Sequence, residues 1–180
     1  MRIRPASLLA AMLLFAVSAL AQAADPVAES SVKAAFLYKF SGYIDWPPVR
    51  FADPSAPFVM AVLHDDDVAA ELERLVPGRM VGTHPVAVRR IQPGDSLAGV
   101  QLLFVGGEDP DRAVIRSAQQ SGILVVTESP HGLTAGAAIN FIVANDHVGF
   151  EVSLEAAQRS GHRISSRMLS VARRVVQKGA

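Results

Sequence analysis

Three acidic loops carry the side chains of this sequence that could do chemistry. They are residues 64–67 (HDDD), 106–109 (GGED) and 128–131 (ESPH), and each follows an apolar run that is typical of a strand. Ligands bind beyond the carboxyl ends of the strands in an open parallel sheet. Carboxylates at that edge would suit a divalent cation or a cationic ligand. The alternative is helix capping, which by itself accounts for most of these carboxylates.

Established catalytic motifs are absent from the sequence, which contains no GxGxxG, GxxxxGK[ST], GxSxG or HExxH. The GGED tetrapeptide resembles the GGEF or GGDEF signature of cyclic-dinucleotide synthases. It lacks the Phe, however, and is predicted to open a helix instead of a hairpin. The histidines have no metal-ligand spacing, at positions 64, 84, 131, 147 and 162. We therefore expect no catalytic residue, no cofactor and no metal site, and a protein that is not an enzyme.

The elements that position these loops alternate between strand and helix. PFVMAVL, VQLLFVGG and GILVVTES read as strands, PVAVRRI alternates as a half-buried strand, and VAAELERLV reads as a helix. Asp109 as N-cap and Pro110 in the first turn predict a further helix that runs to Gly122. This alternation predicts an α/β fold, a three-layer sandwich with a mostly parallel sheet.

The two ends of this pattern carry further elements. A helix with a broad apolar face is expected in VKAAFLYKFSGYIDWPP, before Pro47 and Pro48. Near the other end, GAAINFIVANDHVGFEVS predicts a closing antiparallel hairpin that turns at Asn145 and Asp146. Asn140 and Glu151 interrupt its apolar runs, so these polar groups need partners. A structural hydrogen bond to a neighbouring loop is the simpler explanation, and a ligand contact is the alternative.

The last segment, ISSRMLSVARRVVQK, is predicted to form a C-terminal amphipathic helix. Its apolar stripe is expected at Ile164, Met168, Val171 and Val175. The basic side chains of this region would form the solvated face of the helix, or they would meet an acidic partner or anionic lipid. These basic residues are Arg163, Arg167, Arg173, Arg174 and Lys178.

The N-terminus predicts export. Arg2 and Arg4 precede an apolar run at residues 8–20, and the sequence AQA at 21–23 has the form that signal peptidase recognises. A membrane span needs about 20 apolar residues, which is longer than this run. We therefore expect a signal peptide at residues 1–23, cleavage after Ala23, and one soluble domain at residues 24–180.

Charge and cysteine content exclude several classes of function. The whole chain has 17 Lys and Arg against 17 Asp and Glu, and removal of residues 1–23 takes away two arginines. A slightly acidic, exported domain is not expected to bind nucleic acid. The chain has no cysteine, which excludes disulfide switching and thiolate catalysis.

Three segments together resemble the YfiR/HmsC family of exported regulators. They are VKAAFLYKFSGYIDWPP, AAINFIVANDHVGFEVSLEAAQRSG and ISSRMLSVAR. The shared pattern is a helix ending in Trp-Pro, an Ile-Asn-Phe strand, a Val-x-Phe-Glu strand and a helix starting at Ile-Ser-Ser, and it spans about residues 31 to 175.

The resemblance implies a periplasmic repressor. It would bind the periplasmic sensory part of an inner-membrane diguanylate cyclase of the YfiN type, hold it inactive, and so lower cyclic di-GMP and biofilm formation. It also implies a homodimer, an outer-membrane lipoprotein of the YfiB type as a second partner, and no insertion into the membrane. Relatives use cysteine pairs for redox response, which this cysteine-free chain does not share.

The hairpin and the following segment are the predicted docking surface. The candidate partner-binding residues are Asn140, Phe150, Glu151, Ser165, Ser166 and Arg167. Asn140 and Glu151 would fix the local geometry of this surface. The alternative function is a periplasmic small-molecule-binding sensor module, which would use the loops at 64–67, 106–109 and 128–131 and serve another membrane signalling protein.

Overall fold

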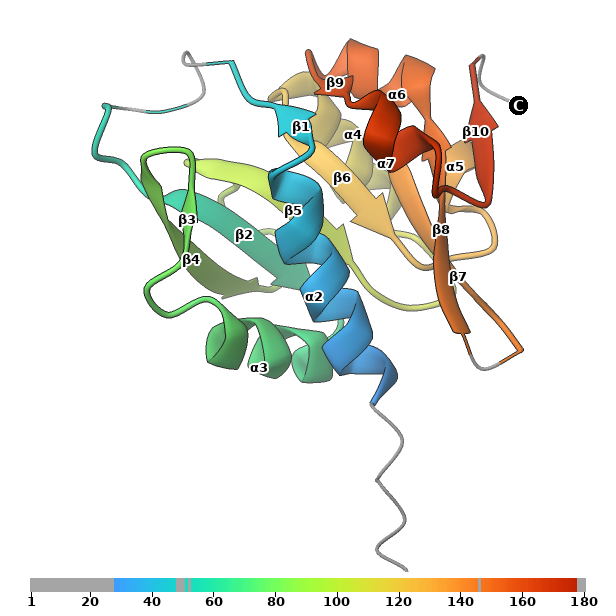
Figure 1. Cartoon of the computed structure of the whole chain (residues 1–180), viewed down its shortest axis with the longest axis horizontal. Helices are drawn as coiled ribbons and strands as arrows, with labels where there is room; N and C mark the ends of the chain where they lie inside the picture. The colour runs from blue at the N-terminus through green and yellow to red at the C-terminus, as the bar shows by residue number, and fades with distance from the viewer. Residues whose placement is uncertain (1–27, 48–50, 52, 146, 178–180) are drawn as a thin grey trace, which may run out of the picture.

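Helices cover both faces of one twisted sheet, which confirms the predicted three-layer α/β sandwich (Figure 1). The computed structural model describes residues 28–47, 51, 53–145 and 147–177. The predicted signal peptide, residues 1–23, lies outside these ranges.

The described elements follow the predicted alternation of helices and strands along most of the chain. The helices are α2 (Glu29–Ser41), α3 (Asp66–Leu75), α4 (Arg112–Gln120), α5 (Gly132–Ala135), α6 (Leu154–Arg159) and α7 (Ser166–Leu169). The strands are β1 (Ile44–Asp45), β2 (Phe58–Leu63), β3 (Met80–Val81), β4 (His84–Ile91), β5 (Val100–Val105), β6 (Leu124–Thr127), β7 (Ile139–Ala144), β8 (His147–Ser153), β9 (Arg163–Ile164) and β10 (Arg174–Val176).

The main sheet is mostly parallel and has the strand order β10-β8-β7-β6-β5-β2-β4-β3. In this order, each pair of neighbours in the run β7-β6-β5-β2-β4 is parallel. The predicted hairpin is confirmed: β8 returns antiparallel to β7 after Asn145, whose φ of 50° is a turn conformation that Asn tolerates. β3 pairs antiparallel with β4 at the other end of the sheet, and β1 pairs with β9 in a separate two-stranded sheet.

Two hydrophobic cores lie on the two faces of the sheet. On one face α2, α3, α6 and α7 pack with side chains such as Leu72 and Met168. On the other face α4 contributes Ile115 and Ala118. Every residue of β5 is buried, because this central strand has helices or loops over both sides. That burial explains why its sequence is a continuous apolar run and does not alternate.

An aromatic cluster fixes α2 across the hairpin. Phe36 and Phe40 of α2 pack on Phe141 of β7 and Phe150 of β8. The ring centroids of Phe40 and Phe150 lie 4.8 Å apart in an edge-to-face arrangement, a geometry that aromatic pairs prefer. Figure 1 shows α2 in front of the sheet, between α3 and the hairpin of β7 and β8.

The C-terminal segment requires a correction. The predicted amphipathic helix forms only over Ser166–Leu169, and Arg174–Val176 then pairs parallel with β8 as a strand. Of the expected apolar stripe, Met168 is buried, whereas Val171 is 68% exposed. The open edge of β8 offers backbone partners that favour a strand of β-branched residues over a helix. The edge of the sheet is consequently β10, and the hairpin lies one strand inside it.

The start of α4 also differs by a few residues from the prediction. Asp111, and not Asp109, is the N-cap, because its Oδ1 accepts hydrogen bonds from the N–H groups of Ala113 and Val114. The type of cap was predicted correctly, and the helix starts after it.

Replacing Gly132 with alanine should destabilise the fold, because a Cβ there would lie 2.0 Å from Thr127 Oγ1 and 2.3 Å from Asn140 Oδ1. Both side chains are buried and bonded to each other, so neither can move away freely. We expect a loss of about 1–3 kcal/mol in the free energy of unfolding, measured by urea denaturation. Gly42→Ala is the control, since its Cβ would meet nothing closer than 3.5 Å. Equal losses in both variants would contradict this packing.

Candidate functional site

The three acidic loops converge at one edge of the sheet, beyond the carboxyl ends of β2, β5 and β6. The N–H of Gly106 donates to Leu63 O at 2.8 Å, and the N–H of Gly107 donates to Glu128 Oε1 at 2.7 Å. The chain passes from β2 outward to β4 and then back across β2 to β5. The edge between β2 and β5 is therefore a topological switch point, where open α/β sheets bind ligands.

Lys33 brings a cation to this edge from α2. The residue is only 7% exposed, and its Nζ forms ion pairs with the carboxylates of Glu29 and Glu128. Burial opposes the charged form of Lys33. The hydrogen bonds and charges of the two glutamates outweigh that effect, so the pKa of Lys33 is raised. The ammonium group ties the N-terminal half of α2 to the loop after β6.

Asp65 is the carboxylate whose ionisation is disfavoured here. Its side chain caps α3 by accepting the N–H of Val68 at 2.9 Å. Burial raises the pKa of Asp65; the bond from Val68 opposes this rise, and the nearby charge of Glu128 adds to it. His64, the residue before it, has φ of 63°, which is strained for a residue with a side chain.

Helix capping accounts for part of the acidic character, as the alternative explanation held. Asp65 is the N-cap of α3, and Asp66 in the first turn pairs with Arg90 at 3.0 Å. Within the described ranges, no group of three or more His, Asp or Glu side chains is arranged to hold a metal ion. Glu128 has a different role, since it joins Lys33 to the backbone of Gly107.

A row of polar side chains crosses four adjacent strands on the β10 side of the sheet. Thr127, Asn140, Glu151 and Arg174 are aligned partners in β6, β7, β8 and β10. Thr127 Oγ1 donates to Asn140 Oδ1 at 2.7 Å. Arg174 donates to both carboxylate oxygens of Glu151, at 2.9 and 3.1 Å. Aligned side chains lie on the same face of a sheet, so these pairs link the hairpin to its two neighbouring strands.

The predicted docking residues lie on two faces of the sheet. Asn140 faces α5, because Gly132 of that helix packs against its Oδ1, and the aligned Glu151 points the same way. Phe150 points to the opposite face and is 2% exposed in the aromatic cluster. The structure therefore does not gather these residues into one rim.

The other three predicted residues belong to α7, on the same face as α2. Ser165 is the N-cap of this short helix and accepts the N–H of Met168. Ser166 and Arg167 are exposed, while Met168 is 3% exposed and anchors the helix in the core. Of the predicted residues, Ser166 and Arg167 are exposed, and Glu151 and Ser165 are partly exposed.

Sequence reasoning missed two contributors, Lys33 and Arg174. Lys33 shares the spacing i, i+4, i+7 with Leu37 and Phe40, both of which are buried. A lysine on the apolar face of a helix needs a buried anionic partner, and this was a readable signal. Arg174 was expected in the C-terminal helix but lies in β10, so its pairing with Glu151 had no signal in the local pattern.

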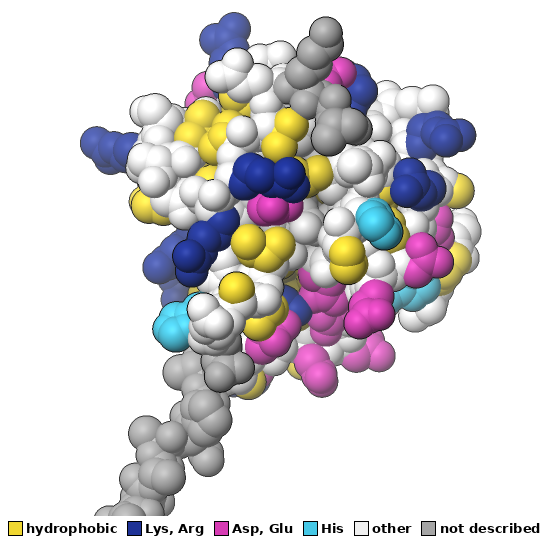
Figure 2. Space-filling model, turned by 90° about the vertical axis from the view of Figure 1, so that its right-hand side faces the viewer, with side chains coloured by type: hydrophobic (Ala, Val, Ile, Leu, Met, Phe, Trp, Pro, Cys, Tyr) yellow, Lys and Arg dark blue, Asp and Glu magenta, His cyan; other side chains and the backbone are white. Residues whose placement is uncertain are grey.

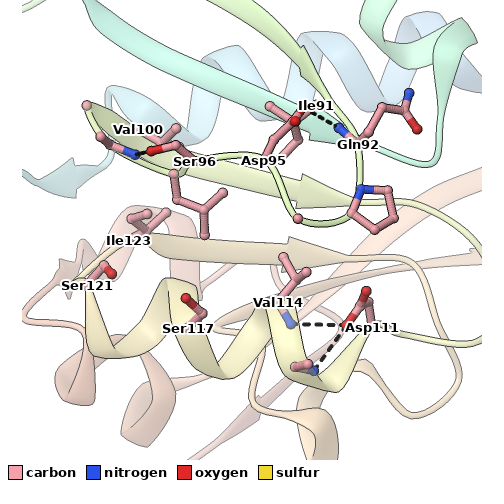
Figure 3. Close-up of a pocket in the computed structure, with 16 residues that line it drawn as sticks. Ile91, Gln92, Asp95, Ser96, Val100, Asp111, Val114, Ser117, Ser121 and Ile123 are labelled. Atoms are coloured by element: carbon pink, nitrogen blue, oxygen red, sulfur yellow. Dashed lines mark hydrogen bonds between the residues drawn. The ribbon is translucent and has the colours of Figure 1, made fainter.

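A cavity of about 880 Å³ lies elsewhere, between the loop after β4 and helix α4 (Figure 3). Its two carboxylates already serve the local backbone. Asp95 accepts the N–H of Gln92 at 2.8 Å, and Asp111 caps α4. These bonds explain the polar groups there without a ligand, so the carboxyl edge is the stronger candidate site.

Replacing Lys33 with methionine should lower the free energy of unfolding, because Glu128 would lose its cationic partner while its side chain is only 17% exposed. We expect a loss of about 1–3 kcal/mol at pH 7, measured by urea denaturation. The raised pKa of Lys33 means that its stabilising effect is complete below pH 10 and is lost as the pH rises through the folded-state pKa. Lys39→Met, on the exposed side of α2, is the control. A comparable loss in the control would argue against the ion pair.

Replacing Asp65 with asparagine should preserve or raise stability at pH 7, since asparagine caps helices as well as aspartate does. The folded-state pKa of Asp65 is raised, so its ionisation costs stability above that pKa. The advantage of the variant should therefore be present at neutral pH and disappear as the pH falls below about 4. Thermal unfolding of both proteins between pH 3 and pH 7 measures this difference. A variant that is less stable at pH 7 but not at pH 3 would reverse the expected sign.

No curated protein matches the chain. A protein-family model described as YfiR/HmsC-like matches residues 30–173 of the 180, from the first turn of α2 to the residue before β10. No helix in the described part of the chain is long and apolar enough to cross a bilayer. Because the match covers far more than half of the sequence, the chain belongs to the YfiR/HmsC-like family.

Proposed function

We propose that this protein is a periplasmic regulator that represses an inner-membrane diguanylate cyclase. It binds the periplasmic sensory part of that enzyme and so lowers cyclic di-GMP and biofilm formation. The observation that carries the proposal is the family match over residues 30–173. The absence of established catalytic motifs from the sequence agrees with a regulatory role.

Export and assembly are parts of the same proposal. The apolar run at 8–20 and the AQA sequence at 21–23 support cleavage of a signal peptide and delivery of residues 24–180 to the periplasm. The regulator acts as a homodimer, and an outer-membrane lipoprotein of the YfiB type competes for it. Membership of the YfiR/HmsC-like family supports both statements.

The docking surface in this proposal centres on α7. Met168 holds the helix in the core while Arg167 is exposed, so the arginine is presented from a fixed platform. Arginine is enriched in protein interfaces because its guanidinium group makes several directed hydrogen bonds. The neighbouring side of the molecule, at the right of Figure 1, carries basic side chains mainly in its upper half and acidic ones mainly in its lower half (Figure 2). Such a separation of charge favours one orientation of a charged partner.

Deletion of the gene should raise cellular cyclic di-GMP, and restoring the exported protein should reverse the rise. A copy that lacks residues 1–23 should fail to restore repression, because it would stay in the cytoplasm. Arg167→Glu should also fail, with normal thermal stability, whereas Arg116→Glu should repress normally. Arg116 is the matched control because it is exposed on α4, on the opposite face of the sheet.

Cyclic di-GMP measured by mass spectrometry in these strains is the readout. Unchanged levels after deletion would reject the repressor function. If Arg167→Glu restores repression as well as the wild-type protein does, the repressor function is supported and α7 is rejected as the docking surface.

A further inference from the structure

The strand β4 leaves backbone groups unpaired along its outer side. It has 8 residues, whereas β3 has 2 and pairs only with His84 and Pro85. These two strands form the end of the main sheet opposite β10 (Figure 1). No described strand pairs with the outer side of residues 87–91. An open edge of this kind is where an extended segment of another chain can add to a sheet.

One hydrogen bond shows which backbone groups of β4 face outward. The N–H of Val86 donates to Arg79 O at 3.0 Å, on the side where β3 lies. Backbone groups point alternately to the two sides of a strand, so those of Val88 and Arg90 also face outward. No described residue bonds to the backbone of Val88 or Arg90 on that side. The edge therefore offers two N–H donors and two carbonyl acceptors to a further strand.

Arg90 does not guard this edge against pairing. Charged side chains on an edge strand usually oppose the approach of another chain. Arg90 is instead directed toward α3, where it pairs with Glu73 at 2.9 Å and with Asp66 at 3.0 Å. Val86 and Val88, on the same face of β4, pack partly buried against the core. With the charge of Arg90 compensated, this face of the edge suits an apolar side chain.

Arg89 lies on the opposite face of β4 and keeps an uncompensated charge. Its terminal nitrogens donate to Ser96 O at 3.0 Å and to Ala98 O at 3.2 Å, so the loop after β4 holds the guanidinium group in place. Its Nε is enclosed and has no hydrogen-bond partner among the described residues. No described carboxylate pairs with Arg89, and carbonyl groups carry no net charge. A carboxylate opposite Arg89 on an added strand would supply the complementary charge.

A second copy of this chain is a poor occupant of the edge. Antiparallel pairing of two β4 strands would join the outward groups of Val88 to those of Arg90 in the other copy. That register sets Arg89 directly opposite Arg89 of the second copy, and like charges so placed destabilise a sheet. A shift one way meets Arg79, which already bonds to Val86, and a shift the other way sets Arg90 opposite Arg90. The edge therefore suits a different chain.

We propose that the outer edge of β4 binds an extended segment of another protein, in which a carboxylate stands between two apolar residues. The segment pairs antiparallel with β4, as β3 does, and bonds to the backbone of Val88 and Arg90. Its carboxylate faces Arg89, and its apolar residues lie on the α3 side. This surface is separate from α7, so the inference goes beyond the proposed function and does not rest on it.

Titration of the purified chain of residues 24–180 with the peptide acetyl-Ser-Thr-Val-Glu-Val-Thr-Ser-amide tests the edge. By NMR we expect the amide signals of Val88 and Arg90 to shift in a saturable way and their hydrogen exchange to slow, because both N–H groups gain an acceptor. The amides of Ala87 and Arg89, which face β2, should change little. Lysine in place of the glutamate of the peptide should weaken the Kd by about fivefold.

Two variants separate the backbone contribution from the charge. Val88→Pro should abolish binding, since proline has no N–H, and the fold should survive because proline is tolerated where the N–H of an edge strand faces solvent. Val88→Thr keeps the N–H and a similar shape, so it is the matched control and should bind with unchanged affinity. Arg89→Gln should remove the preference for the glutamate peptide over the lysine peptide. The Tm of each variant shows whether it is folded.

Several results would overturn the inference. These are the absence of shifts at Val88 and Arg90, shifts at β10 instead, equal affinity for the two peptides, or full binding by a folded Val88→Pro variant. If light scattering shows that Val88→Pro converts a wild-type dimer into a monomer, a second copy occupies the edge and the inference is wrong. Arg89→Gln decides the question if Val88→Pro does not fold. Peptide binding is measured on the isolated protein and repression in cells, so the failure of either one is distinguishable from the failure of the other.

Discussion

The packing of α2 against the hairpin is the interaction on which the rest of the structure depends. Phe40 contacts both Phe141 and Phe150, with ring centroids 5.7 and 4.8 Å apart. This contact closes the main core and fixes the direction of the helix. The same helix then places Lys33, two turns earlier, against the carboxyl edge of the sheet. A nonlocal aromatic contact thus helps to determine where the buried cation lies, and the ion pairs of Lys33 with Glu29 and Glu128 depend on it.

Much of the fold could be predicted because the signals were local. The continuous apolar run of β5 indicated a strand covered on both faces, and the turn at Asn145 indicated the hairpin. The last segment could not be predicted from its own residues. Its apolar positions fit a helix, but the free edge of β8 supplied backbone partners that no local pattern reveals. Tertiary context decided between two conformations that the sequence allows.

The candidate site shows the same division between local and distant information. The three acidic loops were recognisable from the strand pattern, and a parallel sheet was bound to bring them to one edge. The partners were not recognisable, since Lys33 and Glu128 are separated by 95 positions in the chain. Phe150 and Glu151 lie on opposite faces because side chains alternate along a strand. That alternation could be read from the sequence and was sufficient to separate Phe150 from Glu151, whereas the position of Asn140 depends on the register of the hairpin.

The position of β10 has a consequence for how members of this family can differ. The family match ends at residue 173, and β10 begins at Arg174. This outermost strand therefore lies beyond the shared span, although it completes the ion pair with Glu151 and covers the edge of β8. A short tail outside the common core can be lost, lengthened or exchanged in evolution while the layers beneath it stay intact. The width of the sheet, and with it the amount of open backbone offered to other chains, can vary among relatives that keep the same core.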